Sequence, residues 1–139
     1  MLSIAELAAR RESSGIRLGL TAAEVEAVLG EPSRRERRPR ALFYGSLVLF
    51  FTQAVDEVEM IVWYPGQYGE HPLVEGDFPL ELDAVKEWLA ARNISWTTDA
   101  FLTVDEYVGF TTEQDVSLVF VDGALEKLHV TRPRSGGLD

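Results

Sequence analysis

A repeated pattern of apolar residues constrains this chain of 139 residues more than any other feature. Four apolar positions of one helix-forming segment recur 60 residues later: Leu20, Val25, Val28 and Leu29 are matched by Leu80, Val85, Trp88 and Leu89. The strand-forming segments 47–50 and 116–120 also resemble each other, at an offset near 69. We interpret the match as an internal duplication. Neither half could bury its apolar face alone, so the halves must join their sheets edge to edge or pack face to face.

The clearest local signal is a capped helix in the first half. Thr21 and Glu24 are spaced for a capping box, and Gly30 followed by Pro32 predicts where the helix ends. Within it we expect a buried stripe of Val25, Val28 and Leu29. A shorter helix is predicted over residues 3–12 with Ser3 as its cap, and a third over 83–92.

The strand signals are runs of β-branched and aromatic residues between turn residues. They predict strands at 41–44, 47–51, 58–63, 116–121 and 125–131, and one long or broken strand between about 95 and 110. Asp122-Gly123 predicts a two-residue hairpin turn.

These elements predict an α+β fold. We expect two tandem α-β-β-β repeats, with antiparallel sheet or sheets and the helices packed on one face. The length suits a single compact domain over 1–139. Its predicted parts are repeat 1 (16–64), a connecting loop (65–79), repeat 2 (80–131) and a flexible tail (133–139).

The first repeat resembles a known module. Leu20-Thr21, Glu24-Val25, Leu29-Gly30 and Pro32, followed by Tyr44-Gly45 and an apolar strand, are similar to the helix-then-meander unit of the small outer-membrane-assembly lipoproteins. The β-lactamase inhibitory protein family uses a similar unit twice. The resemblance covers about 17–64 and, more loosely, 80–131, and it implies a fold that binds proteins. Small acidic toxin-immunity proteins are also similar in build.

Charge is distributed unevenly along the chain. The sequence has 23 acidic and 13 basic residues, a net charge of −10. Residues 53–126 hold sixteen acids against Lys86 and Arg92, a net charge of −14. Such a surface repels nucleic acid and anionic lipid and attracts basic partners. We therefore expect a basic protein partner, and neither a nucleic acid nor a membrane.

The N-terminal residues do not read as a targeting segment, because Glu6 and Arg10 interrupt the apolar positions. No apolar run approaches the ~20 residues that cross a bilayer. The expected compartment is the cytoplasm.

The sequence shows few features that are typical of a catalytic site. His71 and His129 are the two histidines, and neither has a nucleophile and an acid at a spacing that would make a catalytic site. There are no cysteines, no phosphate-binding loop and no paired metal-ligand motif. The sequence predicts no catalytic residue, cofactor or metal, and no enzyme.

An arginine cluster occupies residues 34–40, with five arginines in seven positions. It could bind phosphate, but the acidic chain and the lack of interleaved aromatics oppose nucleic-acid binding. We favour an exposed loop and strand edge that pairs with acids of the same molecule or of a second copy.

The candidate partner-binding surface is the aromatic loop 63–68 with the acids around it. Alternation along a strand forces one member of each pair Phe50-Phe51 and Trp63-Tyr64 away from the core-facing side. Tyrosine and tryptophan are enriched at binding hot spots. The predicted site residues are Trp63, Tyr64, Tyr68, Glu59, Glu70, Glu75 and Asp77.

The sequence thus favours a non-enzymatic protein-binding module of the immunity or inhibitor type that covers a basic partner, such as a toxin. One alternative is a small-molecule-binding or hydrolytic protein that uses a cleft between the repeats with His71 and nearby acids. Another is a self-associating structural protein in which the arginines meet an acidic sheet. Monomer and homodimer both remain open.

Overall fold

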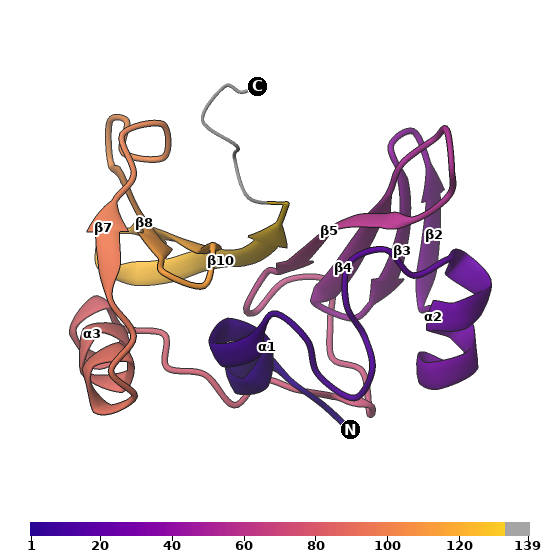
Figure 1. Cartoon of the computed structure of the whole chain (residues 1–139), viewed down its shortest axis with the longest axis horizontal. Coiled ribbons are helices and arrows are strands. Elements are labelled where there is room, and N and C mark those ends of the chain that lie inside the picture. The colour runs from indigo at the N-terminus through magenta and orange to yellow at the C-terminus, as the bar shows by residue number, and fades with distance from the viewer. Residues whose placement is uncertain (133–139) are drawn as a thin grey trace.

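The computed structural model describes residues 1–132 and has an α+β fold (Figure 1). Its helices are α1 (Ile4–Arg10), α2 (Ala22–Leu29) and α3 (Leu82–Ala91). Its strands are β1 (Leu2–Ser3), β2 (Arg34–Arg37), β3 (Arg40–Tyr44), β4 (Leu47–Phe51), β5 (Val58–Trp63), β6 (Val74–Glu75), β7 (Trp96–Thr98), β8 (Tyr107–Thr112), β9 (Val116–Val121) and β10 (Ala124–Thr131). The expected tail at 133–139 lies outside the described residues.

Eight of these strands form one antiparallel sheet in the order β2-β3-β4-β5-β10-β9-β8-β7. A four-stranded meander preceded by a helix therefore occurs twice, and the two meanders join edge to edge where β5 pairs with β10. Along this seam Trp63 lies opposite Leu128, and Met60 opposite Thr131. The duplication of the sequence itself stays a prediction.

Each meander has four strands, so the prediction of three was wrong. In the first half, the arginine-rich segment forms β2, an edge strand whose residues pair with β3 from Arg34–Phe43 to Arg37–Arg40. In the second half, the strand predicted over about 95–110 as long or broken is broken, into β7 and β8, by the loop 99–106. Edge strands need no apolar alternation, because one side of the ladder and much of both faces meet water.

Helix α2 confirms the predicted capping box. The Thr21 hydroxyl accepts a hydrogen bond from the Glu24 amide at 3.2 Å, and the Glu24 carboxylate accepts one from the Thr21 amide at 3.0 Å. Gly30 ends the helix with φ +79°, a conformation that favours glycine. Val25 and Leu29 are buried, but Val28 is 44% exposed, so its place in the buried stripe was wrong.

The main core lies between one face of the sheet and the helices. It contains buried residues of all three helices and alternate residues of the strands. Phe51, which is 2% exposed, therefore lies in this core, whereas its neighbour Phe50 packs on the other face of the sheet. Figure 1 shows the helices below the sheet, with α1 between α2 and α3. The prediction that the helices pack on one face is confirmed.

The N-terminal segment is hydrogen-bonded to the second meander. The Ser3 hydroxyl caps α1 by accepting a hydrogen bond from the Glu6 amide at 3.1 Å. At the other end of α1, the Arg11 guanidinium donates hydrogen bonds to the carbonyl oxygens of Asp115 and Thr131, at 2.9 and 2.7 Å.

Within residues 1–132, every helix is too short or too polar to cross a membrane.

Candidate functional site: a cleft at the end of the central strand

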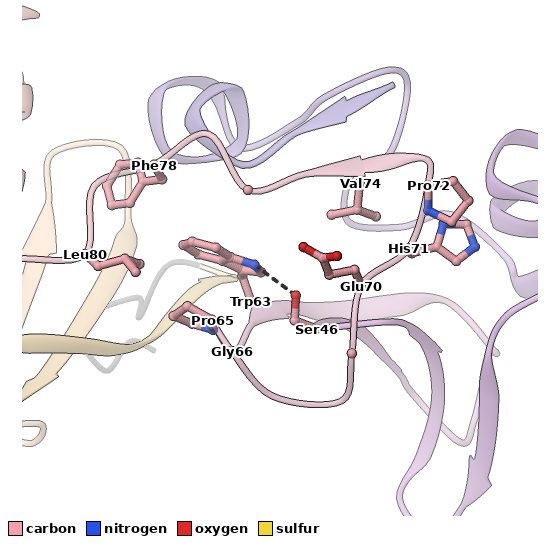
Figure 2. Close-up of a pocket in the computed structure, with 12 residues that line it drawn as sticks. Ser46, Trp63, Pro65, Gly66, Glu70, His71, Pro72, Val74, Phe78 and Leu80 are labelled. Atoms are coloured by element: carbon pink, nitrogen blue, oxygen red, sulfur yellow. Dashed lines mark hydrogen bonds between the residues drawn. The ribbon is translucent and has the colours of Figure 1, made fainter.

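A cleft of about 660 Å³ opens where β5 runs into the connection that leads to α3 (Figure 2). Its lining comes from the first meander and from residues 65–80, with Leu80 as its one residue from the predicted second repeat. The residues that line it are Ser46, Trp63, Pro65, Gly66, Gly69, Glu70, His71, Pro72, Val74, Gly76, Phe78 and Leu80.

Trp63 forms the fixed side of the cleft. Its side chain is 5% exposed, and its indole Nε1–H donates a hydrogen bond to the Ser46 hydroxyl at 3.1 Å. Phe78 meets the ring edge-on, with centroids 6.4 Å apart. The indole is therefore held at both its polar and its apolar end.

Residues 69–78, here called the strap, form the opposite side. At one end the strap crosses the β3–β4 turn so closely that a Cβ on Gly45 would lie 2.8 Å from the Gly69 carbonyl oxygen. Farther along, β6 pairs in parallel with β1. A Cβ on Gly76 would lie 3.2 Å from the Trp63 ring, so glycine at this position leaves the edge of the indole uncrowded.

Glu70 and His71 are neighbours on the strap but point in different directions. Figure 2 shows the Glu70 carboxylate turned towards the Trp63 indole, while the His71 ring lies at the far end beside Pro72. The His71 Nδ1 accepts a hydrogen bond from the Leu73 amide at 3.1 Å, and its ring meets Tyr44 edge-on at 5.3 Å. The cleft thus holds one carboxylate directed inwards, and the imidazole is engaged at its rim.

The chemistry of the lining is an aromatic face, aliphatic walls, a hydroxyl and one carboxylate. No lysine or arginine among the described residues lines the cleft. Nor do three histidine, aspartate or glutamate side chains come together anywhere in residues 1–132 in a way that would hold a metal ion. The arrangement suits a ligand group that carries a positive charge and has a flat or apolar surface.

The predicted aromatic surface is divided between two faces of the sheet. Trp63 belongs to the main core, whereas Tyr64 packs on the other face near Phe43. Tyr68 lies over both, with ring centroids 5.7 Å from Tyr64 and 5.1 Å from Phe43, and is 51% exposed. Burial, and then Tyr68 and Glu126, raise the pKa of Tyr64, so its hydroxyl stays protonated. Trp63 is therefore not part of the surface that Tyr64 and Tyr68 present.

The four predicted acids are also unlike one another. Glu59 on β5 and Glu75 on β6 are exposed, and Glu70 lines the cleft. Asp77 instead completes the cap of α1, because its carboxylate accepts hydrogen bonds from the Ser3 hydroxyl at 2.6 Å and from the Ala5 amide at 3.0 Å. Asp77 thus has a structural task that the sequence did not reveal.

Three residues that shape the cleft were not predicted: Ser46, Gly76 and Phe78. Ser46 follows Gly45 in the β3–β4 turn, which was identified only as a turn. Gly76 stands between two acids in a segment that was expected to be irregular. Their roles depend on the strap crossing the end of β5, and no local pattern indicates that crossing.

A second hollow, of about 550 Å³, lies over the strands near the seam and includes Met60, Thr111, Ser117 and His129. The Thr111 hydroxyl donates a hydrogen bond to Asp99 at 2.9 Å. This hollow is lined mostly by short polar side chains and contains none of the predicted site residues. We therefore take the cleft beside Trp63 as the candidate site.

Comparisons with protein-family models, with curated proteins and with solved structures found no match for the chain. The resemblance of residues 17–64 to the helix-then-meander family therefore stays a prediction, and the function is argued from the site and its charge.

Proposed function

We propose that this chain is a non-enzymatic protein-binding module of the immunity or inhibitor type, which covers a basic partner such as a toxin in the cytoplasm. The observation that carries the proposal is the acidic surface built by residues 53–126. Eleven acids of this segment are exposed: Glu59, Glu70, Glu75, Asp77, Glu81, Asp83, Glu87, Asp105, Glu106, Glu113 and Asp122.

Few bases of the described chain form ion pairs with acids of this segment. The four ion pairs within residues 1–132 are Arg10–Glu6, Arg34–Glu36, Arg35–Glu26 and Arg40–Asp56. Of the sixteen acids in residues 53–126, these pairs therefore include one, Asp56. Three of the pairs engage the arginine cluster, with Glu26 of α2, Glu36 of β2 and Asp56 of the β4–β5 turn. This use of the cluster weighs against self-association through those arginines.

The two bases within the acidic segment lie over aromatic rings. The Lys86 ammonium is 5.5 Å from the centre of the Trp96 ring, and the Arg92 guanidinium is 4.0 Å from that of Trp88. With so few bases in the segment, its charge is balanced by ions from solution or by a partner. A basic protein that displaces those ions is attracted at long range and in a salt-dependent way.

The volume of the cleft supports a second candidate, binding of a small molecule. Hydrolysis there is less favoured, because the His71 ring lies at the rim and its Nδ1 is engaged by the Leu73 amide. A small ligand would occupy the cleft without requiring the exposed acids outside it. Substituting the exposed acids Glu59 and Glu75 should therefore impair binding of a basic protein but not binding of a small molecule in the cleft.

The test is retention of source-cell proteins on the immobilised chain at low and moderate salt. We compare Glu59→Gln/Glu75→Gln with Glu12→Gln/Glu31→Gln, which changes the net charge equally outside the acidic segment. A basic protein should bind the parent and the control, be released by salt, and associate roughly tenfold more slowly with the first variant at low salt. Equal association with both variants, or no salt-sensitive partner, contradicts the proposal.

A further inference from the structure

Trp63 differs from the other two tryptophans of the chain in what lies beside it. Trp88 and Trp96 each have a cation of this chain over the ring, Arg92 and Lys86 respectively. No described lysine or arginine is placed over Trp63, and Figure 2 shows a carboxylate, Glu70, turned towards it. An indole next to a carboxylate, without a cation of its own, is half of a cation-binding site.

The position of this pair is set by the framework of the cleft. Trp63 is fixed by the bond to Ser46 and by Phe78. The backbone at Glu70 is fixed because the strap lies directly on Gly45, where a Cβ would come within 2.8 Å of the Glu70 carbonyl carbon. A ligand would therefore meet a ring that is already in place and a carboxylate carried on a fixed backbone, which reduces the entropy lost on binding.

From this geometry we infer that the cleft receives one arginine side chain of the basic partner, with its guanidinium between the Trp63 indole and the Glu70 carboxylate. This inference rests on the proposed function and names the contact that anchors the partner. Arginine fits because its guanidinium can donate two parallel hydrogen bonds to one carboxylate, and because its flat group can lie against the small part of Trp63, 5% of the residue, that is exposed in the cleft. The acidic segment 53–126, which supplies every lining residue of the cleft except Ser46, provides the charge complementarity.

The sharpest probe is a blocked tripeptide, acetyl-Gly-Arg-Gly-amide, and its counterpart with citrulline. Citrulline has nearly the same shape as arginine but carries no charge. The indole N–H signals of Trp63, Trp88 and Trp96 in the isotope-labelled full chain report where a peptide binds. We expect the arginine peptide to shift the Trp63 signal saturably, and the citrulline peptide to leave it unchanged.

The matched variants are Glu70→Gln and Glu31→Gln, which remove the same charge from the cleft and from an exposed residue outside the acidic segment. Glu70→Gln should weaken binding of the arginine peptide by about tenfold, because a charged hydrogen-bonding partner is lost. Glu31→Gln should bind it as the parent does. Equal responses to arginine and citrulline, equal losses in both variants, or no shift at Trp63 would each overturn the inference.

The partner protein separates this inference from the proposed function. A salt-sensitive partner that dissociates from Glu70→Gln and from Glu31→Gln at the same rate refutes the arginine contact but leaves the proposed function standing. Arginine-peptide binding at Trp63 without any salt-sensitive protein partner refutes the proposed function but leaves the cation site standing.

Discussion

The Asp77 carboxylate accepts a hydrogen bond from the Ser3 hydroxyl at 2.6 Å, across a sequence separation of 74 residues. Because Ser3 also caps α1, this contact links the strap of the cleft to the first helix. Asp77 is thus an acid whose loss would disturb the fold as well as the charge.

We predict that Asp77→Ala lowers the free energy of unfolding by about 1–2 kcal/mol, through loss of a charged acceptor at a helix N-terminus. Glu75→Ala, two residues away and exposed, should change it by less than about 0.5 kcal/mol. Urea unfolding of both variants measures the difference. Equal stabilities would mean that the contact contributes nothing.

Gly45 is predicted to be the least replaceable glycine of the cleft. Gly45 and Gly66 both have positive φ, +61° and +78°, so alanine at either site should cost about 1–2 kcal/mol in backbone strain. Only at Gly45 would the new Cβ also press on the strap. Gly45→Ala should therefore be clearly less stable than Gly66→Ala, and should move the Trp63 indole N–H signal. Equal free energies of unfolding for Gly45→Ala and Gly66→Ala would show that the strap can move away from the new Cβ at no cost.

Stability should fall at high pH because of Tyr44. Burial, and to a lesser degree Glu26, raise the pKa of Tyr44 to about 12. The folded state therefore holds the phenolic proton more tightly than the unfolded chain, where the pKa is about 10. This contribution is complete below pH 10 and is lost as the pH rises towards 12.

The Tyr44→Phe variant isolates this effect. At pH 8 it should be about 1 kcal/mol less stable than the parent, because the Tyr44 hydroxyl donates to the Gly30 carbonyl oxygen at 2.9 Å. By pH 11 the gap should shrink, since phenylalanine has no proton to lose. Urea unfolding at the two pH values measures it, and parallel declines in the two proteins would contradict the assignment.

Tyr68 should govern how long the basic partner stays bound. Its ring is 51% exposed above Phe43 and can bury large area without a change in the core. Tyr68→Ala should raise the dissociation rate by about thirtyfold, the equivalent of about 2 kcal/mol at a hot spot. Phe101→Ala, an exposed aromatic on the loop between β7 and β8, is the control. Surface-binding kinetics in which both variants dissociate alike would remove Tyr68 from the interface.

Local chemistry accounts for the parts of the fold that were predicted. Thr21 and Glu24 specify a helix start through bonds within one turn. Asp122 and Gly123 both have positive φ, as the predicted two-residue turn requires. The alternation that puts one member of the pair Phe50-Phe51 on the other face also follows from neighbouring residues alone, and in the structure that member is Phe50.

The parts that were missed depend on residues far apart in the sequence. The residues of strand β2 show no apolar pattern. The strand is defined by its pairing with β3, in which Arg34 lies opposite Phe43 and Arg37 opposite Arg40. The cleft likewise depends on the strap crossing Gly45, and Asp77 acquires its role only when Ser3 arrives beside it. The sequence placed Trp63, Glu70 and His71 near one another but did not show which of them face the same space.

The seam between β5 and β10 has a consequence for the growing chain. About 60 residues separate the end of β5 from the start of β10, so at typical synthesis rates β5 waits roughly 3–12 s with an open edge. The backbone groups of that edge are the ones that β10 will later pair. During this interval β10 of another copy would fit the same edge, so the seam is where two nascent chains would exchange strands.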